Sequence, residues 1–254
     1  MIGKLESMWR YPVKGFTAET LDRATLAAGD FFPCDRLFAI EDGPSGFDPA
    51  APAWIAKQRF TVLAKIAAVA RARTAYDEAS GVLVARADGQ SDFCGALDDE
   101  RGRDGFAAWL TTLLRDDAAG TLKVVQAPGH RFTDHPSGFV SILNLASVRD
   151  FEGKVGRRLD PLRFRANLHV EGWPPWVETQ AVGRRVRIGG ALARVTSQIV
   201  RCAATHVDPT SAQRDFDLVP ALFEAYGHRH CGVYVALETG AAVAVGDPIE
   251  LLET

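Results

Sequence analysis

The sequence predicts a mostly β protein with some helices, an α+β fold built around β-barrels. Short runs of alternating apolar and polar residues recur at close spacing and are broken by Gly, Pro and Asp, as is typical of a barrel or sandwich. Only three segments place apolar residues at helical spacing. No strand pattern leads through a glycine-rich turn into a helix, so the sequence indicates neither a P-loop nor a dinucleotide-binding fold.

The expected strands lie in both halves of the chain. In the first half they cover residues 5–14, 21–26, 37–40, 67–72 and 82–85. In the second half they cover residues 186–188, 191–195, 233–237 and 249–252. The first of these runs ends in a turn bounded by Pro12, and residues 45–52 read as a loop.

Three helices are expected, over residues 104–114, 145–155 and 218–226. In the first, Phe106, Leu110 and Leu113 fall on one face, and Asp104 is the expected N-cap. Gly156 and Gly227 follow the other two helices as stop signals. A polar stretch near residues 117–121 divides the chain into two expected domains, residues 1–118 and 119–254.

Composition narrows the class of protein and its partners. The chain has 254 residues, of which 47% are hydrophobic and 24% charged, which is typical of a globular protein that buries a core without disulfides. The net charge is −3 and there is no basic arm, so a nucleic-acid partner is not expected. No signal-peptide pattern and no apolar run of about 20 residues is present, so we expect a cytoplasmic protein with no membrane partner.

Cysteine spacing points to one candidate residue. Cys34, Cys94, Cys202 and Cys231 are far apart and form no Cys-x-x-Cys pair, which excludes iron–sulfur clusters and four-cysteine zinc sites. Cys202 follows Arg201 at the end of an apolar run, and a neighbouring cation favours the thiolate form that binds metals or attacks electrophiles. The alternative is a cysteine at a strand end that is simply part of the core.

Several basic residues beside turns are candidates for binding an anion. Lys14 follows a proline turn, Arg36 follows Asp35, and Arg163, Arg165 and Asn167 would share one face of an extended segment. The arginine fork suits phosphate, and an asparagine amide suits a heterocycle. The alternative for each is a solvated surface residue. Together with Cys202, they would suit an anionic, phosphate-bearing, metal-containing ligand.

Two further groups of residues have side chains suited to other chemistry. Cys202, His206, His228, His230 and Cys231 are zinc-ligand types, although their spacing fits no standard zinc finger. Residues 134–137, Asp-His-Pro-Ser, lack the Gly-x-Ser-x-Gly elbow of a serine hydrolase and are better interpreted as a turn or a ligand-contacting loop.

A series of short motifs, in this order and spacing, carries a family resemblance. The motifs are residues 11–14 (Tyr-Pro-Val-Lys), Asp35-Arg36, Gln58-Arg59, residues 160–167, Arg201-Cys202, residues 205–209, residues 232–234 and residues 245–248. On these motifs the chain resembles the MOSC-domain family, named for the C-terminal domain of molybdenum cofactor sulfurases. It is most similar to members with an added N-terminal β-barrel, such as the amidoxime-reducing components and their bacterial relatives. Residues 1–118 would then be the N-terminal β-barrel domain, and residues 119–254 the MOSC β-barrel domain with peripheral helices.

The resemblance implies a molybdenum cofactor, with molybdopterin as its organic part. By matching positions, Cys202 would be the catalytic residue and would bind molybdenum beside the two dithiolene sulfurs. The residues implied to contact the pterin and its phosphate are Lys14, Arg36, Arg165, Asn167 and Arg201, with Ser137 in a loop that makes further contacts. Gly15 and Val200 stand where amidoxime reductases have serine, and Ala166 stands where proline is usual.

The implied activity is a molybdenum-dependent oxidoreductase that reduces small N-hydroxylated compounds such as hydroxylamines and amidoximes. Since the chain has no iron–sulfur motif, its electrons would come from a separate redox protein. An alternative is a carrier in which Cys202 holds the cofactor or a persulfide for delivery to another enzyme. A third is a structural zinc protein.

Overall fold

Seven strands close into a barrel in the computed structural model, which describes residues 1–253. Around the barrel they are β1 (Ile2–Arg10), β10 (Leu168–Glu171), β9 (Phe139–Asn144), β13 (His230–Leu237), β12 (Ala191–Val200), β11 (Arg185–Ile188) and β15 (Pro248–Leu251), which returns to β1. All neighbours are antiparallel except β9 and β10. β2 (Glu19–Leu21) pairs with the far end of β1.

Alternating side chains from these strands fill the barrel. Leu5 and Met8 from β1 and Ile142 from β9 are fully buried, together with Val235 from β13 and Ile249 from β15. Because successive residues of a strand point to opposite faces, this alternation fixes which face lines the core. Because the ring of strands is closed, each barrel strand has a paired neighbour on both sides.

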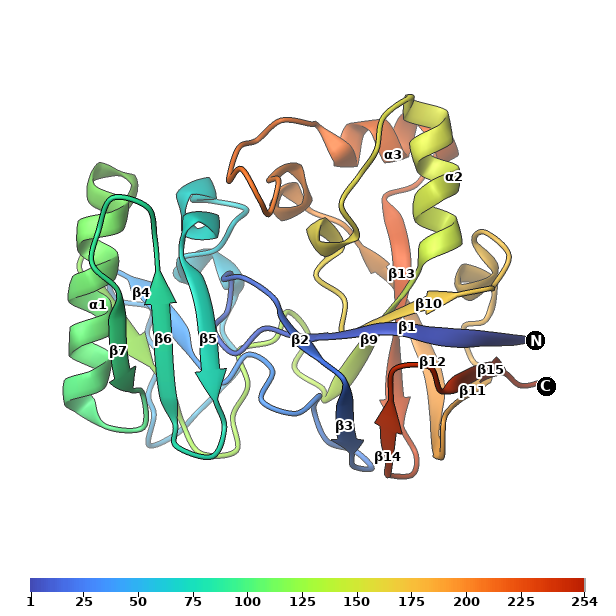
Figure 1. Cartoon of the computed structure of the whole chain (residues 1–254), viewed down its shortest axis with the longest axis horizontal. Coiled ribbons are helices and arrows are strands. Elements are labelled where there is room, and N and C mark those ends of the chain that lie inside the picture. The colour runs from blue at the N-terminus through green and yellow to red at the C-terminus, as the bar shows by residue number, and fades with distance from the viewer. Residues whose placement is uncertain (254) are drawn as a thin grey trace.

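A smaller unit stands beside the barrel (Figure 1). It contains the pair β4 (Ala39–Asp42) and β8 (Leu122–Val125), and the three-stranded sheet β5 (Arg73–Asp77), β6 (Val82–Arg86) and β7 (Phe93–Ala96). Helix α1 (Glu100–Leu114) packs on this unit through Phe106, Leu110 and Leu113, which are buried. A separate pair, β3 (Arg23–Leu26) and β14 (Ala241–Ala244), lies at the barrel side.

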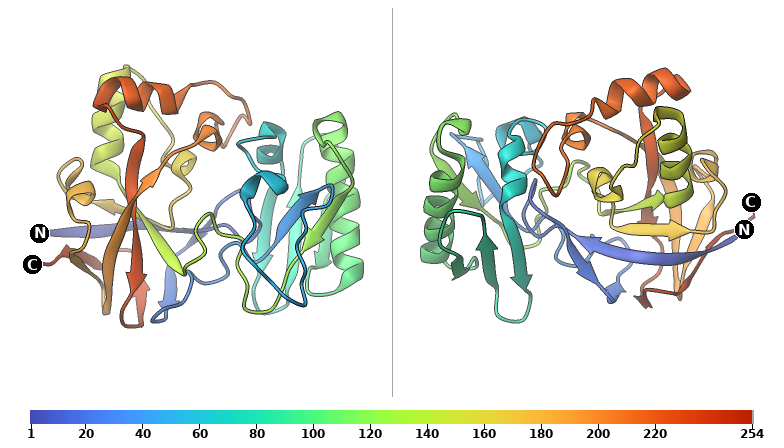
Figure 2. Two further views of the ribbon diagram at one scale, coloured as in Figure 1. Left: turned by 180° about the vertical axis from the view of Figure 1, so that it is seen from behind. Right: turned by 45° about the horizontal axis from the view of Figure 1, so that its top comes forward.

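Three connecting segments carry the chain between the two units: residues 11–18, 27–38 and 126–138. The first leaves β1, places Val13 and Phe16 in the core of the smaller unit, and returns to β2. Val13 forms a parallel bridge with Phe38 at the end of the second segment. Figure 2 shows both ends of the chain on the barrel, where the amino group of Met1 donates to the Leu251 carbonyl at 3.0 Å.

Two helices cover one end of the barrel, α2 (Leu145–Val155) and α3 (Leu218–Tyr226). Asn144 caps α2 by accepting from the Ala146 N–H, and Gly156 ends it at φ +68°. Gly227 ends α3 in the same left-handed conformation, at φ +72°. Both helices span the predicted residues. Within residues 1–253, no helix combines the length and apolar content needed to cross a bilayer.

The mostly β fold with three α-helices is confirmed, while several details of the prediction are wrong. Residues 67–71 form a 3₁₀ helix, η2, rather than a strand, and α1 begins at Glu100 with Asp99, not Asp104, as its N-cap. Residues 163–167 are not extended, because η4 (Pro161–Phe164) ends in Arg165 at φ +52°. Six strands were missed: β5 (Arg73–Asp77), which follows the expected strand over residues 67–72, and β7, β8, β9, β10 and β14.

The division at residue 118 stays a prediction. The hydrogen bonding adds one fact to it: β1, β2 and β3 lie with the barrel rather than with the smaller unit. Lys4 in β1 faces both Glu171 and Pro248, and Ala24 in β3 faces Val243. The smaller unit therefore follows these three strands in sequence and precedes the rest of the barrel.

Candidate functional site

A cavity of about 370 Å³ lies where the connecting segments and both units meet. All seven residues that the family resemblance implies for the site line its wall: Lys14, Arg36, Ser137, Arg165, Asn167, Arg201 and Cys202. They come from all three connecting segments, from the turn after η4, and from the residues that directly follow β12. The structure thus brings together residues that are up to 188 positions apart in the sequence.

Cys202 lies directly after β12 and before η6 (Ala203–His206). Its carbonyl accepts the Thr205 N–H at 3.0 Å and the Thr205 hydroxyl at 2.9 Å, which fixes the turn that carries the thiol. The side chain is partly exposed to the cavity. The Lys57 ammonium lies 3.4 Å from Sγ, so a full positive charge stands beside the sulfur.

Lys57 belongs to a chain of alternating charges along the cavity wall. The two carboxylate oxygens of Asp134 each accept from one lysine, Lys14 at 2.6 Å and Lys57 at 2.9 Å. Desolvation would raise the pKa of Asp134, but the charges of Lys14 and Lys57 outweigh it and hold that pKa well below its usual range. Asp134 likewise raises the pKa of Lys57 to about 12, against desolvation, so Lys57 stays protonated. Lys14 is nearly fully buried, and its burial lowers its pKa.

Two guanidinium groups enclose the ring of Tyr11. The Cζ atoms of Arg36 and Arg165 each lie 4.3 Å from the ring centroid, within range of a cation–π interaction. Arg36 pairs with the carboxylate of Asp35 and donates to the Arg165 carbonyl at 3.1 Å. Burial raises the pKa of Tyr11 to about 12, so its hydroxyl stays neutral.

Only part of the Arg165 guanidinium group is hydrogen-bonded by the protein. Nη1 donates to the Phe16 carbonyl at 2.6 Å, whereas Nη2 is buried and has no partner within residues 1–253. Burial, and then the charge of Arg36, lower the pKa of Arg165 to about 10. A buried donor without a partner is costly, so this geometry favours an anion that would accept from Nη2.

Arg201 and Asn167 hold the cavity wall together. Arg201 is buried and donates to the backbone carbonyls of Cys231 and Phe164, the latter at 2.6 Å. Within the described chain it pairs with no carboxylate, and its burial lowers its pKa. The Asn167 amide accepts from Ser141 and donates to the Trp9 carbonyl at 3.2 Å, which leaves one amide hydrogen for a ligand.

The balance of charge in the cavity is positive. Its cationic lining residues are Lys14, Arg36, Lys57, Arg163, Arg165 and Arg201, and its acidic ones are Asp35 and Asp134. Arg163 is neutralised outside the cavity by Asp208 and Asp215, both at 2.7 Å. The remaining excess of positive charge makes this cavity suited to an anionic ligand.

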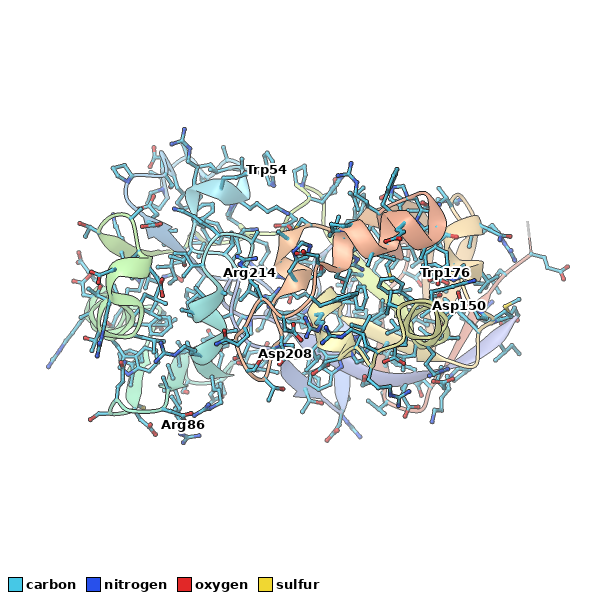
Figure 3. All side chains as sticks on the ribbon, turned by 90° about the horizontal axis from the view of Figure 1, so that it is seen from above. Trp54, Arg86, Asp150, Trp176, Asp208 and Arg214 are labelled. Carbon is cyan, nitrogen blue, oxygen red and sulfur yellow. The ribbon has the colours of Figure 1, made fainter. Side chains whose placement is uncertain are left out.

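Two residues outside the cavity lining connect the smaller unit to the segments around the cavity. Trp54 donates from its indole nitrogen to the Thr133 carbonyl at 3.2 Å. Arg214 donates to the carbonyls of Leu63 at 2.7 Å and Ala203 at 3.1 Å, and so ties the smaller unit to η6. Figure 3 shows Arg214 at the junction of the units and Trp54 at the upper margin of the view, near the same junction.

The alternative chemistries find less support in the geometry. Within residues 1–253, no three His, Cys, Asp or Glu side chains lie together as a metal-ion site would require. Burial raises the pKa of Cys231 to about 12, and His228 stacks on Tyr226 instead of approaching Cys202. The loop that contains Ser137 lines the cavity, as expected of a ligand-contacting loop.

The cation beside the Cys202 thiol is Lys57, whereas the sequence pointed to Arg201. The neighbouring cation inferred from the sequence was Arg201, whose guanidinium in fact bonds to backbone carbonyls. Lys57 precedes the Gln58-Arg59 motif, but nothing local indicates that it reaches a cysteine 145 positions away. Only the fold of the 43–66 loop brings the two together.

Comparisons with known proteins match both parts of the chain. The family model described as the MOSC N-terminal beta barrel domain matches residues 2–120, and the model described as the MOSC domain matches residues 129–250. Mitochondrial amidoxime-reducing component 1 of Mus musculus is 28% identical over 125 residues, covering 44% of this chain and 36% of that protein. Molybdenum cofactor sulfurase of Caenorhabditis elegans is 29% identical over 121 residues, covering 47% of this chain and 16% of that protein. These matches thus span about a third or less of each relative's length.

Two solved structures are similar at low identity. The YuaD protein from Bacillus subtilis is 18% identical, with a TM-score of 0.44 over 98% of this chain and 94% of that chain. YiiM from Geobacillus stearothermophilus is 20% identical, with a TM-score of 0.36 over 45% of this chain and 54% of that chain.

Proposed function

This chain belongs to the MOSC-domain family, and from that premise we propose that it is a molybdenum-cofactor-dependent reductase of small N-hydroxylated compounds. The observation that carries the proposal is the Cys202 thiol beside the Lys57 ammonium, in a cavity with an excess of positive charge. The similarity to an amidoxime-reducing component supports the same activity.

The donor set of the cavity fits this cofactor. A thiolate is the soft ligand that a metal such as molybdenum takes from a protein, and Cys202 would supply it. A phosphate suits guanidinium donors, and Arg165 has a buried Nη2 with no partner in the described chain. Lys14, Arg36, Arg201 and the free amide hydrogen of Asn167 would complete the contacts to phosphate and pterin, with Ser137 at the edge.

The overall reaction is a two-electron reduction. The N–O bond of the substrate breaks, two electrons and two protons are consumed, and the products are the amine or amidine and water. When bound, the cofactor supplies the redox chemistry that removes the oxygen. The chain's own residues bind and orient: Cys202 anchors the metal, Lys57 places a positive charge beside the anchor, and Asp134 holds Lys57 in position.

We propose a separate redox protein as the electron source. The chain has four cysteines without a Cys-x-x-Cys pair, which does not suit an iron–sulfur cluster. The cofactor would therefore be reduced by a partner that docks near the cavity.

A carrier role is the second candidate, and one observation favours it. Cys202 is partly exposed, so a persulfide or cofactor held there would be accessible for transfer, and the chain is similar to a molybdenum cofactor sulfurase. A carrier would show sulfane sulfur or cofactor on Cys202 without turnover. A reductase would turn over benzamidoxime with an artificial electron donor.

The decisive measurement is the molybdenum and pterin content of protein purified from a host that makes the cofactor. We expect near-stoichiometric molybdenum in the wild type and its loss in Cys202→Ala. Cys94→Ala is the matched control, since Cys94 lies exposed on β7 and does not line the cavity. Absence of both metal and pterin from the wild type in a cofactor-replete host would refute the proposal.

A further inference from the structure

Three neighbouring barrel strands present hydroxyl side chains to the candidate site. On β13, Val233 and Val235 are buried in the barrel core, so the alternation of side chains along the strand turns Tyr234 outward. Tyr234 lies opposite Ser141 on β9 and opposite Ser197 on β12. All three residues line the cavity. This part of the cavity wall is therefore a row of uncharged hydroxyl groups, unlike the cationic part described above.

A bulge in β12 determines which hydroxyl faces Tyr234. Val195 pairs with Val235, and the next pair is Ser197 with Tyr234, so Thr196 is the extra residue of the bulge. The Thr196 hydroxyl donates to the Tyr234 carbonyl at 3.1 Å and is thus engaged by the backbone. The bulge therefore places Ser197, and not Thr196, beside Tyr234 at the cavity.

Two of the three hydroxyl groups are left for a ligand. The Ser141 hydroxyl donates to the Asn167 amide oxygen at 2.7 Å and accepts the Asn167 N–H at 2.9 Å. Within residues 1–253, the Tyr234 phenol and the Ser197 hydroxyl make no hydrogen bond to the protein, since Tyr234 is engaged only through its carbonyl. These two hydroxyls can therefore pair with one group of a bound molecule.

The Tyr234 phenol is a hydrogen-bond donor held in place. The ring centroids of Phe139 and His135 lie 6.0 Å and 6.1 Å from that of Tyr234, so packing restricts the ring. Burial, and then the charge of Asp134, raise the pKa of Tyr234 and outweigh the opposing charge of Arg201. The phenol therefore keeps its proton. Packing accounts for the aromatic ring, but a phenylalanine would pack equally well, and the hydroxyl needs another explanation.

An uncharged donor suits an uncharged oxygen better than it suits a phosphate. The phosphate is served by guanidinium groups, among them the unpartnered Nη2 of Arg165. The oxygen of an N-hydroxyl group is neutral, and it both accepts and donates a hydrogen bond, as do the hydroxyls of Tyr234 and Ser197. A site built to pair with a substrate hydroxyl discriminates against an analogue without it, because the polar groups of the site are then left unpaired.

We propose that Tyr234 is a specificity-determining residue that donates a hydrogen bond to the hydroxyl oxygen of the N-hydroxylated substrate, while Ser197 accepts from the same hydroxyl. This inference rests on the proposed function and assigns recognition of the N–O group to the barrel wall. The reduced product has lost the oxygen and leaves both protein hydroxyls unpaired. The same contacts therefore favour binding of substrate and release of product.

The test removes one oxygen from the protein and one from the ligand. Tyr234→Phe deletes the phenol hydroxyl and keeps the ring, and the uncharged probes N-hydroxyurea and urea differ by one oxygen. Their affinities for protein purified from a cofactor-making host are measured by ligand-observed NMR. The wild type should prefer N-hydroxyurea, and Tyr234→Phe should reduce the ratio of the two affinities about two- to tenfold. An equal ratio in wild type and variant would overturn the proposal.

Two further variants locate the effect. Ser197→Ala removes the second hydroxyl and should reduce the ratio by a similar factor. Tyr76→Phe is the matched control, because Tyr76 lies on β5 and lines neither cavity of the structure, and it should keep the wild-type ratio. Any contact between a metal and the probes is common to all these proteins and cancels in the comparison. The same reduction in Tyr76→Phe as in Tyr234→Phe would overturn the assignment.

Molybdenum and pterin analysis of the same samples separates this inference from the proposed function. Cofactor in the wild type, with a preference that Tyr234→Phe leaves unchanged, would refute the role of Tyr234 and leave the reductase standing. A preference that Tyr234→Phe reduces, in wild-type protein without molybdenum and pterin, would support recognition of the N–O group and refute the reductase. Loss of cofactor from Tyr234→Phe with an unchanged preference would assign the phenol to the cofactor and overturn the proposal.

Discussion

Lys57 is the residue through which the smaller unit reaches the thiol of the barrel. Its ammonium touches both Asp134 and Cys202, and its side chain is 28% exposed. A charged hydrogen bond of this kind contributes about 1.5–3 kcal/mol, or about one to two orders of magnitude in an equilibrium constant. Lys57 is thus expected to affect how firmly the anionic ligand is held.

We predict that Lys57→Met retains at least about tenfold less molybdenum after dialysis than the wild type. Lys65→Met is the matched control, because Lys65 lies on the same loop and pairs with Asp42 instead of the cavity residues. Metal analysis before and after dialysis checks this. Equal loss from both variants would contradict a role for the contact with Cys202.

Gly15 occupies a position where the backbone itself excludes a side chain. Its φ is +88°, and a Cβ there would lie 2.8 Å from the Thr61 carbonyl oxygen and 3.1 Å from the Val62 Cα. Both contacts are with backbone, which cannot rotate away. The absence of a serine at this position therefore reflects the local fold of this chain.

We predict that Gly15→Ser destabilises the protein by about 2–5 kcal/mol, the sum of a left-handed conformation and an overpacked contact. Gly129→Ser should cost only about 1–2 kcal/mol, since Gly129 also has a positive φ, of +72°, but open space around its Cβ position. Urea unfolding followed by tryptophan fluorescence measures both. Equal costs would show that the close approach to Thr61 is relieved by a small shift.

Much of the candidate site could be predicted at the level of single residues. Residue type and motif order identified Cys202 and the cations, and the fold places them around one cavity. Lys57 could not be found this way, because its partners lie far away in sequence. The turn at Arg165 was also hidden: an arginine at positive φ carries no sequence signal, and an extended segment was expected instead.

At the scale of elements, the strongest predictions came from helices with clear ends. α2 and α3 span the expected residues because an apolar face and a terminal glycine coincide in both. Residues 67–71 were misread because a short apolar run, here residues 67–70, suits a strand and a short helix alike. Alanine-rich composition, which favours helical conformations, was the signal available there.

The pairing of β1 with β10 contains a buried histidine that links stability to pH. His169 on β10 is 3% exposed, its Nδ1 meets Ser7 Oγ at 3.2 Å, and its Nε2 has no partner within residues 1–253. Burial, and then the charge of Arg201, lower the pKa of His169 to about 4. The folded protein therefore keeps this ring neutral in a range where the unfolded chain protonates it.

We predict that stability falls as the pH drops from about 6.5 toward 4, because there the unfolded chain binds a proton that the folded protein does not. At pH 5 the cost from His169 is about 2 kcal/mol. His169→Gln should remove that part of the pH dependence, whatever its effect at pH 7. Urea unfolding at pH 7 and pH 5 checks this, and an unchanged difference between the two pH values in the variant would refute it.

At the scale of the whole molecule, the site exists because the chain passes repeatedly between two units. Lys14 and Arg36 lie on two of the three connecting segments, and Asp134 lies on the third. None of the expected elements indicated these passages, since pairing between distant strands leaves no local pattern. The sequence therefore predicted two β-rich parts, but it did not reveal that the first three strands pair with strands of the second part.

We predict that residues 119–254 alone do not form a cooperatively folded barrel. Without β1 the ring loses a strand, and β10 and β15 both keep an unpaired edge. Residues 1–28 joined by a flexible linker to residues 126–254 should restore closure. Amide dispersion in a ¹H–¹⁵N NMR spectrum distinguishes the two, and well-dispersed signals from the shorter piece would contradict the prediction.

Because β1 pairs with strands from the second half of the chain, it is synthesised long before it can enter the barrel. Leu5 pairs with Val170 and Gly3 with Ile249, so the partners of this strand leave the ribosome long after the strand itself. At roughly 5–20 residues per second, the wait lasts on the order of 10–50 s. Throughout that time Leu5 and Met8, which are fully buried in the finished barrel, lack their final cover. The nascent chain is thus a candidate client for chaperones that bind short apolar segments. Pairing of β15 with β1 completes the barrel and would end that binding.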